Sequence, residues 1–186
     1  VLRKACSDAQ YLPEDCFVAV NISPVQFMTK DFVGNVRETM AATGIKPSRL
    51  ELEVTETAMM QDRERAAIIL QQLAEMGISV AVDDFGTGYS NLSYLIDFSF
   101  GKLKIDRSFV SDSNSGAVVS TIVGLSRALG VGIIAEGVET ENQATLLRAA
   151  GCEVVQGYLF GRPAPLKIEL GAARFEKREA RIVSMH

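Results

Sequence analysis

The segment Ile78-Ser-Val-Ala-Val-Asp-Asp-Phe-Gly-Thr-Gly-Tyr-Ser90 carries the most information about the fold. Ile78 to Val82 form a short apolar run, mostly β-branched, which predicts a buried strand. Asp83 and Asp84 follow at once, and two adjacent carboxylates at the end of a buried strand repel each other. A divalent cation, which takes oxygen ligands, commonly offsets that repulsion. The alternative is a solvated turn, since Asp and Gly are frequent turn residues, and this stretch alone leaves both interpretations open.

Composition bounds the class of protein. The chain has 186 residues, which fits one domain, and 47% of them are hydrophobic, which is enough for a core. Its net charge of −4 gives no basic footprint for DNA. No apolar run approaches the ~18 residues of a membrane span, and no signal peptide opens the chain. We therefore expect neither a DNA partner nor a membrane span in this chain.

Cysteine and histidine usage narrows the chemistry. Cys6, Cys16 and Cys152 show no CxxC spacing, and we interpret them as reduced thiols of a cytoplasmic protein. The single histidine is His186, which argues against histidine-ligated zinc, Ser-His-Asp triads and Cys-His dyads. Acid–base and metal chemistry must then use Asp, Glu, Asn, Lys and water.

Six segments with strand patterns alternate with helical patterns, which argues for an α/β fold with a parallel sheet. Strands are expected at 17–21, 50–56, 78–82, 103–106, 131–136 and 153–156. Helices are expected at 1–10, 27–42, 63–76, 91–98, 116–129 and 140–150. Gly44 is placed to end the second helix, and Thr140 with Gln143 forms a capping box for the last. The charged segment 174–181 is interpreted as a solvated helix.

Polar side chains stand at or near the ends of the six expected strands. They are Asn21, Glu53, Asp83, Lys104, Glu136 and Gln156. In a (β/α)8 barrel the strand ends converge on one face, where the active site lies. An open doubly wound sheet concentrates its site at one switch point instead, so the distribution favours the barrel. The alternation within 50–54 agrees, because Glu51 and Glu53 would then face the barrel axis.

The strand count leaves this barrel incomplete. Eight strands close a barrel of this kind, and six are found in the sequence. An unclosed barrel exposes two sheet edges. We therefore expect about two further strands before residue 1, and the fold class is a modified TIM barrel with about six βα units present.

Taken singly, the strand-end residues also have structural explanations. Asn21 caps a turn, Lys104 extends its charge to water from a sheet edge, and Gln156 is a satisfied core amide. Glu136 and Glu139 are solvated acids that open the next helix, where the helix dipole favours them. These explanations would all have to hold at the strand ends of one face, and that coincidence favours a shared site.

Six motifs resemble those of the EAL-domain cyclic-di-GMP phosphodiesterases, in the order of that family and across residues 1–166. They are Asn21-Ile-Ser, Glu51-Leu-Glu-Val-Thr-Glu56, Asp83-Asp-Phe-Gly-Thr-Gly-Tyr-Ser90, Leu103-Lys-Ile-Asp-Arg-Ser-Phe-Val110, Ala135-Glu-Gly-Val-Glu-Thr140 and Gln156-Gly-Tyr-Leu-Phe160. The resemblance makes 1–166 a phosphodiesterase domain and leaves 167–186 as a C-terminal helical tail. It implies hydrolysis of cyclic-di-GMP, a bacterial second messenger, to linear pGpG with two Mg²⁺ or Mn²⁺ ions.

The resemblance also implies roles for individual residues. The metal ligands, matched position by position, are Asn21, Glu53, Asp83, Asp84 and Glu136, with Asp83 as the bridging carboxylate. Lys104 matches the lysine that holds and polarises the attacking water, and Glu136 is also the candidate base. Gln156 matches a residue that lines the water and phosphate site. Glu56 matches a glutamate that fixes the loop after Asp84.

The resemblance extends to partners. The loop 85–93 couples dimerisation to activity in the family, so a homodimer is implied. An upstream sensor or GGDEF-type domain is a further partner that the family allows.

The chain departs from the family in two places. The Glu-Ala-Leu signature, which supplies a further metal ligand and a nearby phosphate-binding arginine, is absent from the sequence, and the connection 111–116 is a few residues shorter than usual. The alternative function is therefore an inactive EAL domain that acts as a cyclic-di-GMP receptor or a protein-interaction module.

Overall fold

The computed structural model describes residues 1–88, 92–112, 116–162 and 184–185. Its strands form one parallel sheet in the order β6-β5-β4-β3-β2-β1-β7. The strands are β1 (Val18–Ile22), β2 (Leu50–Thr55), β3 (Ser79–Phe85), β4 (Lys102–Ile105), β5 (Gly132–Ala135), β6 (Val154–Val155) and β7 (Ser184–Met185). The α-helices are α1 (Leu2–Asp8), α2 (Pro24–Phe27), α3 (Phe32–Thr43), α4 (Glu56–Met60), α5 (Arg63–Glu75), α6 (Arg107–Ser111), α7 (Gly116–Leu129) and α8 (Glu141–Ala149). The 3₁₀ helices are η1 (Ala9–Tyr11), η2 (Pro47–Arg49) and η3 (Leu92–Asp97).

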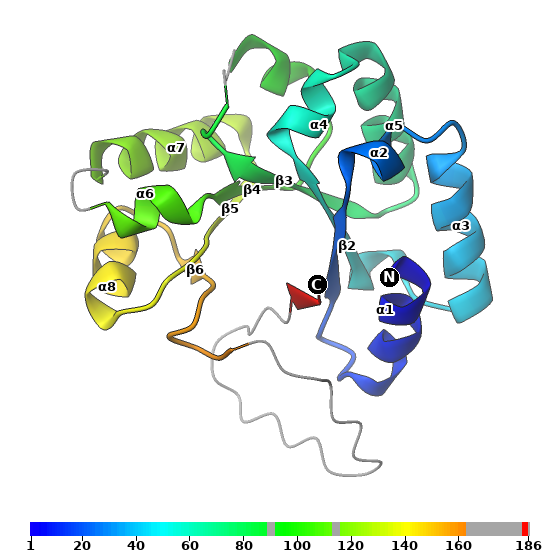
Figure 1. The fold of residues 1–186 in the computed structure, drawn as a ribbon, viewed down its shortest axis with the longest axis horizontal. Helices are drawn as coiled ribbons and strands as arrows, with labels where there is room; N and C mark the ends of the chain where they lie inside the picture. Colours follow the sequence, from blue (N-terminus) through cyan, green and yellow to red (C-terminus); the bar gives the residue numbers. More distant parts are fainter. Residues whose placement is uncertain (89–91, 113–115, 163–183, 186) are drawn as a thin grey trace.

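The sheet is curved, and its helices lie in an arc along the outer, convex side (Figure 1). Strands β1 to β6 follow one another in both sequence and space, which is the order of strands in a TIM barrel. The expected α/β fold, with a barrel-like parallel sheet, is confirmed. Of the helices that the structure describes, none is both long and apolar enough to cross a membrane.

Side chains of β2 point alternately toward the outer helices and toward the concave side of the sheet. Leu50, Leu52 and Val54 belong to the main hydrophobic core, which packs against outer helices such as α5. Glu51 and Glu53 point to the other, concave side, because side chains alternate along a strand, and yet each is only 2% exposed. Such buried acids require partners on the concave side. The expectation that both face the barrel interior agrees with this placement.

Several helix ends agree with the sequence signals. Gly44 ends α3 with φ of +68°, and Thr140 and Gln143 form the capping box of α8. The single helix expected over 27–42 is wrong, because Ser23 caps a separate short helix, α2, and α3 begins only at Phe32. The helix expected over 91–98 is a 3₁₀ helix, η3, and residue 91 lies outside the described residues.

Two further differences concern the sheet. Strand β3 continues through Asp83 and Asp84 to Phe85, so both acids lie within the strand and not after it. A seventh strand, β7, pairs with β1 at Ala19 and Val20. The expected helix over 174–181 lies outside the described residues, as do residues 89–91 of the loop 85–93 and residues 113–115 of the connection 111–116.

Candidate active site

Lys104 occupies the centre of a charged cluster at the carboxyl end of β4. Its Nζ atom lies 2.9 Å from Oε2 of Glu53, 3.1 Å from Oδ1 of Asp83 and 2.6 Å from Oε1 of Glu136. These acids come from β2, from β3 and from the residue that follows β5. The Lys104 side chain is only 2% exposed, so these ion pairs are screened little by solvent. The fold therefore gathers three of the predicted strand-end acids around a fourth predicted residue, the buried cation Lys104.

A β-bulge places the two aspartates of β3 opposite this lysine. The register of β3 with β4 runs Ala81↔Lys102, Val82↔Leu103 and then Phe85↔Ile105. Asp83 and Asp84 together therefore oppose the single residue Lys104. Asp84 has φ of +53°, and among the described residues no other non-glycine residue has a positive φ. Asp tolerates this left-handed conformation better than most residues do.

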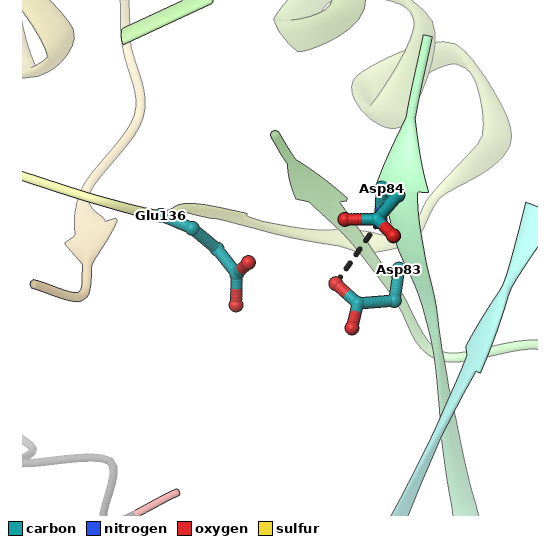
Figure 2. Close-up of side chains that lie close together, drawn as sticks. All are labelled: Asp83, Asp84 and Glu136. Carbon is teal, nitrogen blue, oxygen red and sulfur yellow. Dashed lines mark hydrogen bonds between the residues drawn. The ribbon is translucent and has the colours of Figure 1, made fainter. Parts of the chain in front are cut away.

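The bulge brings three carboxylates within the span of one metal ion. Asp83, Asp84 and Glu136 each offer an oxygen, and these oxygens lie within 4.8 Å of one another. Figure 2 shows the side chain of Glu136, the residue after β5, reaching toward Asp83. Asp83 accepts a hydrogen bond of 3.0 Å from the backbone N–H of Asp84. Carboxylate oxygens in this arrangement are the ligands that Mg²⁺ and Mn²⁺ prefer.

Asn21, in β1, adds a side-chain amide to the carboxylates of the site. It lies beside Glu53 in the register of β1 with β2. With its nitrogen turned inward, its amide donates to Oε2 of Glu53 at 3.1 Å and to Oδ2 of Asp83 at 3.2 Å. With its oxygen turned inward, the amide faces only acceptor atoms, an orientation that a cation between them would stabilise. The amide can thus serve either the ion-free or the metal-bound cluster.

The charge balance of the site is negative. Four carboxylates surround one ammonium, and burial disfavours ionisation of Glu53 and Glu136, whose pKa values are raised although Lys104 partly offsets the effect. Burial, followed by repulsion from Asp83, raises the pKa of Asp84. Burial also opposes the charge of Lys104, but the three acids outweigh it and raise the pKa of Lys104 above its usual value. Lys104 is therefore a fixed cation, and the excess negative charge fits divalent cations.

Gln156 lies beside the cluster at the end of β6. Its backbone N–H donates to the carbonyl of Ala135 and its carbonyl accepts from Val138, at 2.8 and 3.0 Å. Its side-chain oxygen Oε1 is buried and has no hydrogen-bond partner within the described part of the chain. An unsatisfied buried acceptor is costly, so this atom suits a ligand or a water molecule.

Glu56 lies under the turn that follows the aspartates. It is 3% exposed, and its Oε2 accepts a hydrogen bond of 3.2 Å from the N–H of Gly86. Gly86 has φ of +91° and its Cα faces the ring of Phe109, so a side chain there would be strained. The contact ties the start of α4 to the carboxyl end of β3.

One part of the interior was missed at the level of sequence. Glu51 and Lys102 form a second ion pair, 2.5 Å from Oε2 to Nζ, on the same face as the first and toward the other end of the strands. The signal was present in the repeats Leu50-Glu-Leu-Glu and Lys102-Leu-Lys, where each charged residue recurs after two positions. Sequence alone does not show that these two repeats face each other.

The fold and the site agree with comparisons to known proteins. The family model described as the EAL domain matches residues 1–163. The chain belongs to the EAL domain family. It is 46% identical over 173 residues to the "Bifunctional diguanylate cyclase/cyclic di-GMP phosphodiesterase MucR" of Pseudomonas aeruginosa, covering 89% of this chain and 25% of that protein. The chain spans between 20% and 25% of the length of the first curated relatives that it matches.

Solved EAL structures share the fold. The structure of "PaMucR Phosphodiesterase, c-di-GMP complex" has a TM-score of 0.85 and 44% identity, and the match covers 89% of this chain and 75% of that one. The manganese and cyclic-di-GMP complex of Klebsiella pneumoniae BlrP1 has a TM-score of 0.78 and 34% identity, covering 86% of this chain and 42% of that one. The TIM-barrel-like fold of this EAL domain is thereby confirmed.

Proposed function

We propose that this EAL domain hydrolyses one phosphodiester bond of cyclic-di-GMP to give linear pGpG. The single observation that carries the proposal is the buried cluster of Lys104 with Glu53, Asp83 and Glu136. The presence of cyclic-di-GMP in related EAL structures, and the phosphodiesterase names of relatives, supports the choice of substrate.

The proposed cofactors are two divalent cations, Mg²⁺ or Mn²⁺. Their proposed ligands are Asn21, Glu53, Asp83, Asp84 and Glu136, with Asp83 shared between the two ions. The oxygen donors and the negative balance of the cluster fit such ions, and a related structure contains manganese. When bound, the cations supply a lowered pKa for the attacking water and stabilise the attacking and leaving oxygens.

The residues of the chain position the water and move its proton. In the ion-free cluster the three N–H groups of Lys104 are engaged by three acids. With these acids holding the cations, one N–H would be released to donate to the attacking oxygen and orient it. Glu136, whose carboxylate lies 2.6 Å from Nζ of Lys104, receives the proton. Oε1 of Gln156, which has no partner among the described residues, accepts a hydrogen bond from the water or from a group near the phosphate. Glu56 holds the turn after Asp84 so that both aspartates keep their orientation.

We further propose a larger context for the domain. Residues 1–166 form the phosphodiesterase domain and residues 167–186 a C-terminal tail. The loop 85–93 is proposed as a dimer contact, and a sensor or GGDEF-type domain as an upstream partner. All three cysteines are free thiols, which supports a cytoplasmic location.

The test is to incubate the purified protein with cyclic-di-GMP in the presence of Mg²⁺, Mn²⁺ or EDTA, and to measure the formation of pGpG by chromatography. The proposal expects turnover that depends on the cation and is lost in Asp83→Asn. Binding of cyclic-di-GMP without turnover would favour the receptor alternative. Absence of both would exclude cyclic-di-GMP as the ligand.

A further inference from the structure

A second buried ion pair lies in the interior, away from the candidate active site. Glu51 is 2% exposed, and its Oε2 accepts from Nζ of Lys102 at 2.5 Å and from Oγ of Ser79 at 3.0 Å. The other oxygen, Oε1, is buried without a hydrogen-bond partner among the residues that the structure describes. Lys102 is 28% exposed and its Nζ lies 4.3 Å from the centre of the Phe17 ring. Both charged groups are therefore held tightly by their surroundings.

The two ion pairs form a ladder between strands that are not neighbours. Glu51 and Glu53 belong to β2, whereas their partners, Lys102 and Lys104, belong to β4, and β3 lies between. The ladder spans β3 over Ala81, whose short side chain leaves room for the longer ones to meet. Successive inward positions of a strand are about 6–7 Å apart. The pair of Glu51 and Lys102, here called the lower pair, therefore lies one such step from the pair of Glu53 and Lys104, on the side away from the active site.

The lower pair lies just below the β-bulge. Lys102 pairs in register with Ala81, and the regular ladder of β3 with β4 is interrupted after the next pair, at the position of Lys104. At Lys104, backbone hydrogen bonds to β3 therefore constrain the position of β4 less than they do at Lys102 and Leu103. The tie between Glu51 and Lys102 fixes β4 against β2 immediately before that interruption.

The lower pair is expected to contribute little to the stability of the fold. Burial of the Glu51 charge is costly, its partner Lys102 keeps part of its hydration, and replacement of buried pairs by apolar side chains of similar volume is often neutral or stabilising. One oxygen of Glu51 also has no hydrogen-bond partner in the described part of the chain, which adds to the cost. A role in the placement of β4 accounts for a pair that stability alone does not explain.

We propose that Glu51 and Lys102 are positioning residues, which hold β4 so that the ammonium of Lys104 lies between Glu53, Asp83 and Glu136. This inference rests on the proposed function for its kinetic readout. Displacement by ~1 Å of a group that orients the nucleophile can lower a rate up to about 10²-fold. The pair should therefore affect the chemical step and the metal site more than it affects substrate binding or folding.

The experiment compares Lys102→Met with Lys102→Arg, and with Lys46→Met as a matched control, since Lys46 forms an exposed pair 3.9 Å from Glu14. The variants are assayed for kcat and KM with cyclic-di-GMP, for Mn²⁺ affinity by calorimetry and for thermal unfolding. We expect Lys102→Met to lower kcat at least about tenfold, with KM within twofold, and to weaken Mn²⁺ binding. Lys102→Arg should recover most of both, and Lys46→Met should change neither.

Glu51→Gln, which keeps the volume of the side chain, gives a second test if Lys102→Met fails to fold. The variant Glu51→Gln/Lys102→Met should lose no more kcat than either single change, because the two residues act as a unit. A merely structural role predicts instead that kcat and the melting temperature fall together, and that the apolar pair Glu51→Met/Lys102→Met restores both. That result, or unchanged kcat and Mn²⁺ affinity in the single variants, overturns the inference.

The affinity measurement separates this inference from the proposed function. If the wild-type protein binds Mn²⁺ but hydrolyses no cyclic-di-GMP, the proposed function fails, while weakened Mn²⁺ binding in Lys102→Met still supports positioning. Absence of Mn²⁺ binding by the wild-type protein overturns the inference, because no metal site would depend on the placement of β4.

Discussion

Nζ of Lys104, in β4, lies 2.6 Å from Oε1 of Glu136, which follows the neighbouring strand β5. The Lys104 side chain is deeply buried, whereas that of Glu136 is partly exposed. The pair joins the proposed water-orienting cation to the proposed base. Because Glu53 and Asp83 contact the same ammonium, removal of this one group leaves three acids without their cation.

Lys104→Met should therefore affect both stability and catalysis. Loss of one partner of a buried ion network costs about 3–5 kcal/mol, and we expect a reduction of this size in the unfolding free energy measured in EDTA. Mn²⁺ should restore part of it, because the cation replaces the missing positive charge. In turnover assays Lys104→Ala should lower kcat far more than it weakens cyclic-di-GMP binding. Weaker binding with an unchanged kcat would contradict the water-orienting role.

Asp83→Asn tests the shared metal ligand. Asparagine keeps the shape of the side chain but removes the charge that Lys104 contacts and that the proposed cations share. We expect turnover to fall roughly a thousandfold or more, the equivalent of ~4 kcal/mol of lost transition-state stabilisation. Mn²⁺ affinity, measured by calorimetry on the same protein, should fall as well. Near wild-type activity would refute the two-metal account.

Glu56 can be tested with two substitutions that differ in one property. Glu56→Gln retains an oxygen that can accept from the N–H of Gly86, whereas Glu56→Ala removes it. We expect Glu56→Ala to lower kcat by about 10–100-fold, because the turn after the aspartates loses its support, and Glu56→Gln to retain more activity. Equal activity of the two variants would show that the accepting oxygen is not what positions the loop.

Gly157 marks a close approach between two loops of the site. A Cβ atom there would lie 2.2 Å from the carbonyl oxygen and 2.3 Å from the nitrogen of Val138, which is rigid backbone. Gly157→Ala must therefore separate Gln156 from the loop after Glu136, and we expect a loss of about 1–3 kcal/mol in stability together with lower turnover. Gly161→Ala is the matched control, since a Cβ there meets no atom within 4 Å. Similar melting temperatures for both variants would argue against a tight contact.

Because of the buried thiol of Cys152, the stability of the protein should decrease at alkaline pH. It is 1% exposed, and burial raises the pKa of its thiol from 9.0 to about 11. The folded state therefore holds this proton between pH 9 and 11 while the unfolded state releases it, so stability decreases as pH rises through that window. The shift corresponds to about 2–3 kcal/mol.

The measurement is urea unfolding of the wild-type protein and Cys152→Ala at pH 8, 9, 10 and 11. The advantage of the wild-type protein over the variant should shrink between pH 9 and 11, because only the wild-type protein carries this thiol. A constant difference across the four pH values would mean that the thiol titrates alike in both states.

The residues show which parts of the fold were open to prediction. The strand pattern of 50–54, with Glu51 and Glu53 on one face, predicts an interior polar face because a period of two is a local property of the backbone. The capping box of Thr140 and the terminating Gly44 were likewise predictable, since their signals lie within one helical turn. The break between α2 and α3 was missed, because the helix expected over 27–42 begins at the last residue of α2 and includes the polar residues 29–31 that separate the two helices.

Local sequence was enough to predict strands β1 to β6 in order, the face on which β2 places its polar residues, and the set of acids, amides and lysine at the strand ends. These follow from local periodicity and from side-chain chemistry, which residues a few positions apart specify. Three features became visible only in the folded chain: Lys104 contacts three acids, a β-bulge sets Asp83 and Asp84 opposite it, and Glu51 meets Lys102 across β3. These relationships join residues 20 to 51 positions apart, and they depend on strand register and sheet curvature, which the packing of the whole domain sets.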